Sequence, residues 1–388
     1  MKIQISTKHQ LKRSGTTQLR CFQPAEYFRA LGADVTLAQI YKSTPKHGDI
    51  LLLHRVELDK FTNCFVKYAR QLGLILIYDT DDLLFSESSR GYFKRNKRDL
   101  LSAKIDRYRA VMSLCDVILV STERLAKHAR EFHNDVRVVK NALSSNFLDS
   151  AKTVYESKAR RIGHSITLAY MSGSSTHDFD FKVMEKSLIR VLTEYSHVRL
   201  KIVGPVDFSS DFHSFGARFE RLGFVDYKNF PKLYENVDIN LVPLEVEQEF
   251  CQSKSELKFI EAGACGVPSI ASPTDVHCEV IRDKVNGMIV QGNDWYSPMQ
   301  YLLENPLEIQ KLGAVARKQT LELYSSDVRA GEYNAEFVDI LNKYGPASKN
   351  NYHKPGRYKV KLMLEAVRLR RLYSKKVRKH LKRKSVSD

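Results

Sequence analysis

The sequence predicts an α/β protein built from two doubly wound lobes, each with a parallel sheet covered by helices on both faces. In the first half, short apolar runs alternate with amphipathic stretches, which is typical of buried parallel strands and their covering helices. The alternation lapses over the charged residues 151–164, which we interpret as a linker, and then resumes. Two copies of one pattern indicate two Rossmann-like lobes in tandem.

The expected elements follow from this pattern in chain order. Strands of the first lobe are expected at residues 34–40, 49–55, 74–80, 116–122 and 136–142, with helices at 22–31 and 58–72 that end near Gly32 and Gly73. Strands of the second lobe are expected at 166–172, 198–204, 237–243, 268–272 and 287–292, with helices at 181–195, 229–235, 255–264 and 306–324. We therefore assign residues 1–160 and 161–325 to the lobes, 326–350 to a helix that packs back on the first lobe, and 351–388 to a basic helical tail.

The positive charge of the chain is concentrated in that tail. The net charge is +17, and residues 352–388 hold fourteen Lys and Arg against only Glu365 and Asp388. Apolar residues recur there at helical spacing, which predicts a basic amphipathic helix that binds an anionic membrane surface. A solvated charge run is the alternative, and no specific nucleic-acid partner is expected because the folded part has no recognition motif.

Cysteine usage and hydropathy restrict the class further. The six cysteines are far apart without a Cys-x-x-Cys pair, so we expect neither a disulfide framework nor a metal site. The N-terminus has no apolar signal segment, and no stretch approaches the roughly 18 apolar residues of a membrane span. We therefore expect a cytoplasmic protein, associated peripherally with the inner face of the membrane.

The most informative segment is CQSKSELKFIEAGACGVPSIAS, residues 251–272. Ser253 and Glu256 form a capping-box pattern, which predicts a helix whose free amides and dipole bind a diphosphate, with Lys254 and Lys258 adding charge. Glu261 lies about 7.5 Å farther along the axis than Glu256, a separation that suits the ribose attached to the diphosphate. The alternatives are an exposed Glu261 paired with Lys258 and a Ser253 that only caps the helix.

This segment resembles the donor-binding motif of the family-four retaining glycosyltransferases, in which two glutamates flank seven residues ahead of a small-residue run and a Gly-x-Pro turn. Glu261 matches the second glutamate, and residues 262–268 match the run and the turn. The resemblance implies that Glu261 holds ribose hydroxyls and that position 253 contacts the transferred sugar. Ser253 departs from the expected glutamate, so Glu249 or Glu247 is a substitute to consider.

The resemblance extends over most of residues 1–325. In the second lobe it implies a base pocket at Gly223, Phe224 and Val225, and a phosphate contact near Gly173 and His177, although a lone histidine is often structural. In the first lobe it implies a glycine loop and first helix with Gly15 and Arg20 facing the cleft, and an acidic acceptor site at Asp79, Asp81 and Asp82. A solvated turn or a helix cap is the alternative for this acidic run.

Together these features imply a GT-B glycosyltransferase that needs no metal or cofactor. It would move a sugar from a nucleotide-diphosphate donor to a glycan or lipid-linked acceptor in cell-surface polysaccharide synthesis, with Asp79, Asp81, Asp82 and Lys254 as catalytic candidates. The resemblance alone implies that the product retains the anomeric configuration. An epimerase-like enzyme that binds the same donor, a basic nucleic-acid-binding protein and a non-catalytic lobe pair are the alternatives.

Overall fold

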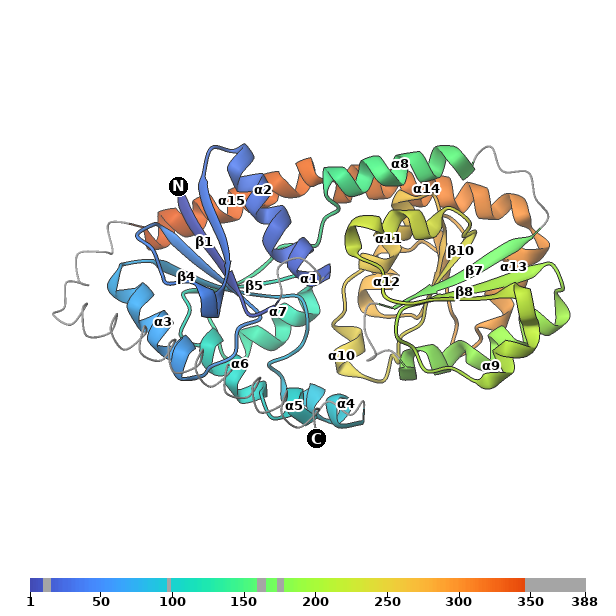
Figure 1. Cartoon of the computed structure of the whole chain (residues 1–388), viewed down its shortest axis with the longest axis horizontal. Helices are drawn as coiled ribbons and strands as arrows, with labels where there is room; N and C mark the ends of the chain where they lie inside the picture. The colour runs from blue at the N-terminus through green and yellow to red at the C-terminus, as the bar shows by residue number, and fades with distance from the viewer. Residues whose placement is uncertain (10–14, 96–98, 159–164, 173–177, 346–388) are drawn as a thin grey trace, which may run out of the picture.

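The computed structural model describes residues 1–9, 15–95, 99–158, 165–172 and 178–345. It contains two six-stranded sheets, in the order β2-β1-β3-β4-β5-β6 and β12-β11-β10-β7-β8-β9. Every strand pair in both sheets is parallel. Figure 1 shows the two sheets in separate lobes that lie side by side, each covered by helices. The predicted fold class of two doubly wound parallel-sheet lobes is confirmed.

The N-terminal lobe contains the first six strands. They are β1 (Lys2–Thr7), β2 (Asp34–Gln39), β3 (Ile50–His54), β4 (Ile75–Thr80), β5 (Val117–Val120) and β6 (Val136–Val138). The helices are α1 (Gly15–Thr17), α2 (Gln23–Ala30), α3 (Lys60–Gln71), α4 (Arg90–Arg95), α5 (Asp99–Ser102), α6 (Ile105–Met112) and α7 (Glu123–Arg130), with a π-helical turn at Gln18–Phe22 and 3-10 turns at Ile40–Lys42 and Glu87–Ser89.

The C-terminal lobe repeats the arrangement. Its strands are β7 (Ile166–Met171), β8 (Val198–Val203), β9 (Phe219–Leu222), β10 (Ile239–Val242), β11 (Ser269–Ala271) and β12 (Gly287–Ile289). The helices that follow β6 are α8 (Ser145–Lys158), α9 (Asp178–Glu194), α10 (Glu249–Gln252), α11 (Leu257–Ala264), α12 (Asp275–Val280), α13 (Tyr296–Glu304), α14 (Pro306–Tyr324) and α15 (Ser326–Tyr344), with 3-10 segments at Ser210–Arg218 and Tyr227–Tyr234.

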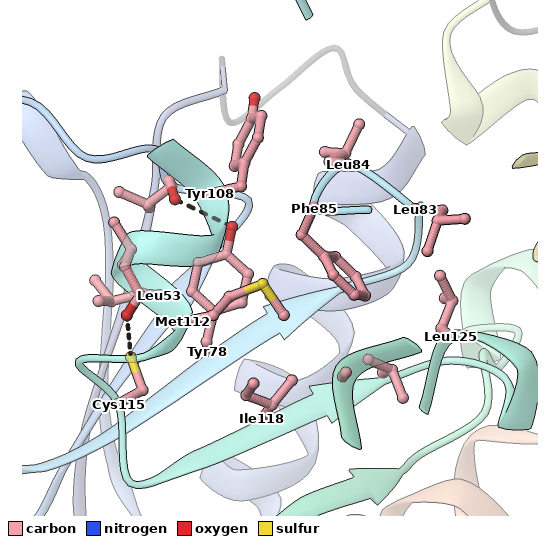
Figure 2. Packing of buried hydrophobic residues seen from close by; sticks show 14 of the residues in the cluster. Leu53, Tyr78, Leu83, Leu84, Phe85, Tyr108, Met112, Cys115, Ile118 and Leu125 are labelled. Atoms are coloured by element: carbon pink, nitrogen blue, oxygen red, sulfur yellow. Dashed lines mark hydrogen bonds between the residues drawn. The ribbon is translucent and has the colours of Figure 1, made fainter. Parts of the chain in front are cut away.

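The core of the N-terminal lobe packs around its central strands. All six residues of β4 are buried, and Tyr78 from this strand lies between α6 and the sheet with Met112 and Ile118 (Figure 2). The Tyr78 hydroxyl donates a hydrogen bond to the Val56 carbonyl at 3.0 Å, which satisfies the one polar atom of this side chain. Burial on both faces explains why these strands are continuous apolar runs.

Residues 151–158 are helical, in contrast to the expected linker. They belong to α8, which packs on α11 and on the 3-10 segment Tyr227–Tyr234. Over residues 151–157, only Ala151 and Val154 are buried, and the polar residues between them face outward. Because the buried stripe is so narrow, the sequence pattern alone did not distinguish this helix from a charged linker.

The last described helix returns to the N-terminal lobe. Phe337 of α15 packs on Phe28 of α2 with ring centroids 4.4 Å apart, and α15 crosses α2 in Figure 1. Among the described residues, no helix is both long and apolar enough to cross a membrane.

A buried ion pair ties the first helical segment to the sheet. The Arg20 guanidinium contacts the Asp79 carboxylate at 2.5 Å, and His54 Nδ1 lies 2.8 Å from the same carboxylate. All three side chains are fully buried. Burial alone would raise the pKa of Asp79, but Arg20 and His54 outweigh it and hold this pKa below its usual value.

Substitution Arg20→Met is expected to lower the free energy of unfolding by about 3–5 kcal/mol, because it leaves the Asp79 charge buried without its partner. Denaturant unfolding measures this loss. Arg130→Met is the matched control, since the Arg130 pair with Glu123 is half exposed and its removal should change stability by less than about 1 kcal/mol. Equal losses in the two variants would contradict a structural role for the buried pair.

Candidate functional site

A cavity of about 420 Å³ lies between the two lobes. Both lobes line it at the carboxyl ends of their parallel strands, which is where ligands bind in doubly wound folds. The polar side chains that line it are His9, Thr16, Arg55, Asp81, Asp82, Tyr108 and Asn141 from the N-terminal lobe, and Tyr227, Lys254, Ser255, Lys258, Glu261 and His277 from the C-terminal lobe.

Helix α11 points its N-terminal end at this cavity. It begins at Leu257, two residues later than predicted, and the expected capping box between Ser253 and Glu256 does not form. The Ser253 hydroxyl instead donates to the Glu249 carbonyl at 2.9 Å, and Glu256 is fully buried. The helix entrance is therefore not closed by a side-chain cap, and an anion could take that place.

Lys258 lies in the first turn of α11 and lines the cavity. Its Nζ is buried, has no hydrogen-bond partner among the described residues, and lies 4.6 Å from the centroid of the Tyr170 ring. Burial, together with the positive charge of Lys254, lowers the pKa of Lys258 to about 8. A buried ammonium without an anionic partner is costly, so a bound anion would stabilise it.

Glu261 lies one turn farther along α11, at the cavity wall. It is almost fully buried, and burial raises the pKa of its carboxyl to about 8, although the Tyr227 hydroxyl beside it opposes the shift. The expected alternative, an exposed carboxylate, is therefore wrong. Such a carboxyl can hydrogen-bond hydroxyl groups that enter the cavity.

The small residues after Glu261 allow α11 to pack closely on α14. A Cβ added at Gly263 would lie 2.6 Å from Thr320 Oγ1 and 3.2 Å from the Ala316 carbonyl oxygen, so a larger side chain would separate the helices. The run therefore holds the helix in place and does not contact the cavity.

The aromatic wall of the cavity lies a few residues after the predicted base pocket. Gly223, Phe224 and Val225 do not line the cavity, and Phe224 is 57% exposed. Tyr227 and Phe230 line it instead, with nearly parallel rings at a centroid distance of 6.0 Å. These two aromatic residues, three apart on one face of a 3-10 segment, are the signal that could have identified this wall.

In the N-terminal lobe only part of the predicted acidic run reaches the cavity. Asp81, Asp82 and Gly15 line it, whereas Asp79 and Arg20 form a fully buried pair and do not line it. The prediction that Arg20 faces the cleft is wrong, because the Asp79 carboxylate holds it in the core. Gly173, His177 and the basic tail lie outside the described residues.

Arg55 holds the two acidic residues of the cavity in place. Its guanidinium contacts Asp81 at 2.6 Å and Asp82 at 2.7 Å, and its backbone has a φ of 47°. Arg55 and Thr16, which donates to Asp81 at 2.8 Å, outweigh the effect of burial and keep the pKa of Asp81 well below its usual value. Asp81 is therefore a fixed negative charge and a hydrogen-bond acceptor, not a proton-transfer group at neutral pH.

His9 completes this side of the cavity. Burial, with Arg55 as the next cause, lowers the pKa of His9 to about 4, so the ring is neutral. Within the described ranges, no group of three His, Cys, Asp or Glu residues is placed to hold a metal ion.

Contacts between the lobes anchor the segment that precedes α11. Arg124 of α7 makes a bidentate pair with Glu249 of α10 at 2.6 and 2.7 Å, and His128 lies 2.7 Å from the same carboxylate. Hydrogen bonds from Arg124 are the main reason that the pKa of Glu249 falls to about 2. The Glu249 carboxylate is thus held by Arg124 and His128, and Glu247 does not line the cavity. Neither residue is therefore placed to replace the sugar-binding glutamate expected at position 253.

An aromatic contact reinforces this anchor. Phe250 of α10 is buried in the core of the N-terminal lobe, where it stacks on Tyr92 at a centroid distance of 4.6 Å. Figure 1 places α10 on the side of its lobe that faces α7. The residues that lead into α11 are therefore positioned by both lobes, and we call this set of contacts of Arg124, His128, Glu249, Phe250 and Tyr92 the interlobe anchor.

Comparison with known proteins identifies the class. Residues 170–305 match the family described as Glycosyl transferases group 1. Three solved structures share the fold. Anabaena Alr3699/HepE in complex with UDP-glucose has 12% sequence identity and a TM-score of 0.62, and the match covers 87% of this chain and 100% of the other. Sucrose-phosphate synthase from Thermosynechococcus elongatus has 14% identity and a TM-score of 0.61, covering 88% of this chain and 100% of the other, and WaaG, a glycosyltransferase involved in lipopolysaccharide biosynthesis, has 10% identity and a TM-score of 0.58, covering 86% and 99%. A comparison with curated protein sequences found no match.

The two lobes and the cavity between them define a protein of the GT-B type. Its C-terminal lobe carries a group 1 glycosyltransferase domain, and the chain is a glycosyltransferase.

Substitution Arg124→Ala is expected to loosen the two lobes, because it removes the bidentate contact with Glu249. Small-angle X-ray scattering should show a larger radius of gyration than for the wild type. The double variant with Glu249→Ala should differ from Glu249→Ala alone only by the loss of the contact between Arg124 and Asp275 at 2.7 Å, since the contact between Arg124 and Glu249 is absent from both. Arg130→Ala is the control, because its partner Glu123 lies on the same helix. An unchanged radius in Arg124→Ala would show that this pair does not hold the lobes together.

Proposed function

We propose that this glycosyltransferase transfers a sugar from a nucleotide-diphosphate donor to a glycan or lipid-linked acceptor of a cell-surface polysaccharide. The observation that carries this proposal is the Lys258 ammonium, which has no hydrogen-bond partner among the described residues and lies next to the cavity at the N-terminal end of α11, where no side chain caps the helix. Such an arrangement suits a diphosphate. HepE, which shares the fold, is described in complex with UDP-glucose, and WaaG acts in lipopolysaccharide biosynthesis.

We propose residues 1–160 as the acceptor lobe and 161–325 as the donor lobe. In the donor lobe, Glu261 would hold the ribose hydroxyls, and Tyr227 and Phe230 would contact the base, because they line the wall next to Glu261. Aromatic side chains provide large contact areas at little cost in conformational entropy.

Departure of the nucleotide diphosphate requires that its developing negative charge be stabilised. Lys254 and Lys258 would supply this, aided by the free end of α11. With a pKa near 8, Lys258 is partly deprotonated near neutral pH, and bound phosphates would favour its protonated form. In the acceptor lobe, the fixed carboxylates of Asp81 and Asp82 would accept hydrogen bonds from acceptor hydroxyls. Retention of configuration follows from the family resemblance alone.

The setting of the reaction is a further part of the proposal. A lipid-linked acceptor would make peripheral association with the inner face of the membrane useful, and the basic residues 352–388 would provide it.

Titration of the wild type with uridine, guanosine and deoxythymidine diphosphate sugars is expected to reveal binding of one class. Glu261→Ala should then weaken that binding by about tenfold or more, because the ribose loses its partner, while the fold persists. Isothermal calorimetry measures the affinity of the wild type and that of the variant. Glu322→Ala is the matched control, since this α14 glutamate is exposed. Absence of binding to all three classes would overturn the proposed function, and unchanged affinity in Glu261→Ala would overturn the role of this residue.

A further inference from the structure

His277 is a cavity residue for which the reading of the sequence assigned no role. It lies in the first turn of α12, whose N-cap Thr274 accepts a hydrogen bond from the His277 amide at 3.3 Å. The side chain is 1% exposed, yet it lines the cavity between the lobes together with Lys258 and Glu261. Because the helix cap fixes its backbone and burial fixes its ring, His277 presents one defined edge to a ligand.

The hydrogen bonding of the ring determines what that edge can do. Nδ1 lies 3.0 Å from the Ser272 carbonyl oxygen, which can only accept, so Nδ1 carries the proton. Burial lowers the pKa of His277 to about 4, and the ring is therefore neutral at physiological pH. Nε2 must then carry a lone pair, and it has no hydrogen-bond partner in the part of the chain that the structure describes.

A neutral acceptor at this place discriminates between parts of a donor molecule. Ionised phosphate oxygens have no proton to donate, so they would be repelled by the Nε2 lone pair. Hydroxyl groups can donate, and a nucleotide sugar carries them on the ribose and on the transferred sugar. Since Glu261 already faces the cavity as the proposed ribose contact, the hydroxyl available to His277 belongs to the transferred sugar.

Two other candidates for this contact, Ser253 and Glu249, are held by neighbouring groups. The Ser253 hydroxyl is bonded to the Glu249 carbonyl, and the Glu249 carboxylate is held by Arg124 and His128. The position at which the resembling enzymes place a sugar-binding glutamate is thus turned away from the cavity, whereas His277 faces it.

We infer that His277 Nε2 accepts a hydrogen bond from a hydroxyl group of the transferred sugar, and that it replaces the sugar contact that Ser253 cannot make. This inference rests on the proposed function, because it requires a nucleotide sugar in the cavity. It makes His277 a determinant of sugar specificity, with no part in charge stabilisation.

Calorimetric titration of His277→Phe tests this inference with two probes: the nucleotide sugar that the wild type binds best, and the corresponding free nucleoside diphosphate. The variant should bind the nucleotide sugar roughly tenfold more weakly, because a sugar hydroxyl would lose its acceptor. Its affinity for the free diphosphate should stay within about twofold of the wild type. His277→Gln, which keeps an acceptor oxygen at similar reach, should recover part of the loss.

His133→Phe is the matched control, since His133 is a largely buried histidine of the other lobe whose ring nitrogens bond only to backbone groups. It should leave both affinities unchanged. Equal weakening of both probes in His277→Phe, or of neither, would overturn the inference while leaving the proposed function intact. Failure of the wild type to bind any nucleotide sugar would overturn both.

Monodeoxy donors provide a test that does not depend on the folding of a variant. Removal of one sugar hydroxyl should weaken binding to the wild type roughly tenfold, and removal of the others should not. His277→Phe should bind this deoxy donor and its parent equally well, because the variant has no acceptor nitrogen with which the sugar hydroxyl could bond. If every monodeoxy donor binds the wild type as tightly as the parent, no sugar hydroxyl is held and the inference is wrong.

Discussion

The site depends on the anchoring of one short segment of the C-terminal lobe in the N-terminal lobe. Arg124 forms an ion pair with the Glu249 carboxylate and Tyr92 stacks on Phe250, so side chains of the N-terminal lobe hold α10 in place. Lys254 lies four residues after Phe250 and three before Leu257, the first residue of α11. The two lobes therefore determine together where the charged entrance of α11 lies, and the cavity is a product of both.

Burial sets the chemistry of the groups placed there. Lys258 and Glu261 are one turn apart on α11, and burial moves the pKa of the lysine down and that of the glutamate up until both lie near 8. On the opposite wall, Arg55 does the reverse and keeps Asp81 ionised. The C-terminal lobe thus offers groups that respond to a ligand, and the N-terminal lobe offers fixed charges.

The fold was predictable from the sequence because strand burial and helix periodicity are local signals. Sites that depend on long-range contacts were not. Arg20 and Asp79 are 59 residues apart, and nothing near either residue indicated that they pair and leave the cavity wall. The Ser253–Glu256 pattern satisfied the local rule for a capping box, but burial of Glu256 took precedence. His277 could not be recognised from the sequence, because only the folded chain places its ring at the wall of the cavity, beside Lys258 and Glu261.

Hydrogen–deuterium exchange with and without the nucleotide sugar that binds best tests the central claim most directly. The backbone amides of Ser255, Leu257 and Lys258 at the start of α11 have no backbone partner in the described part of the chain. If a diphosphate binds there, peptides that span residues 253–261 should exchange more slowly with the ligand present, and peptides of the remote helix α3 should not change. Protection confined to other parts of the lobes, with residues 253–261 unaffected, would contradict the account.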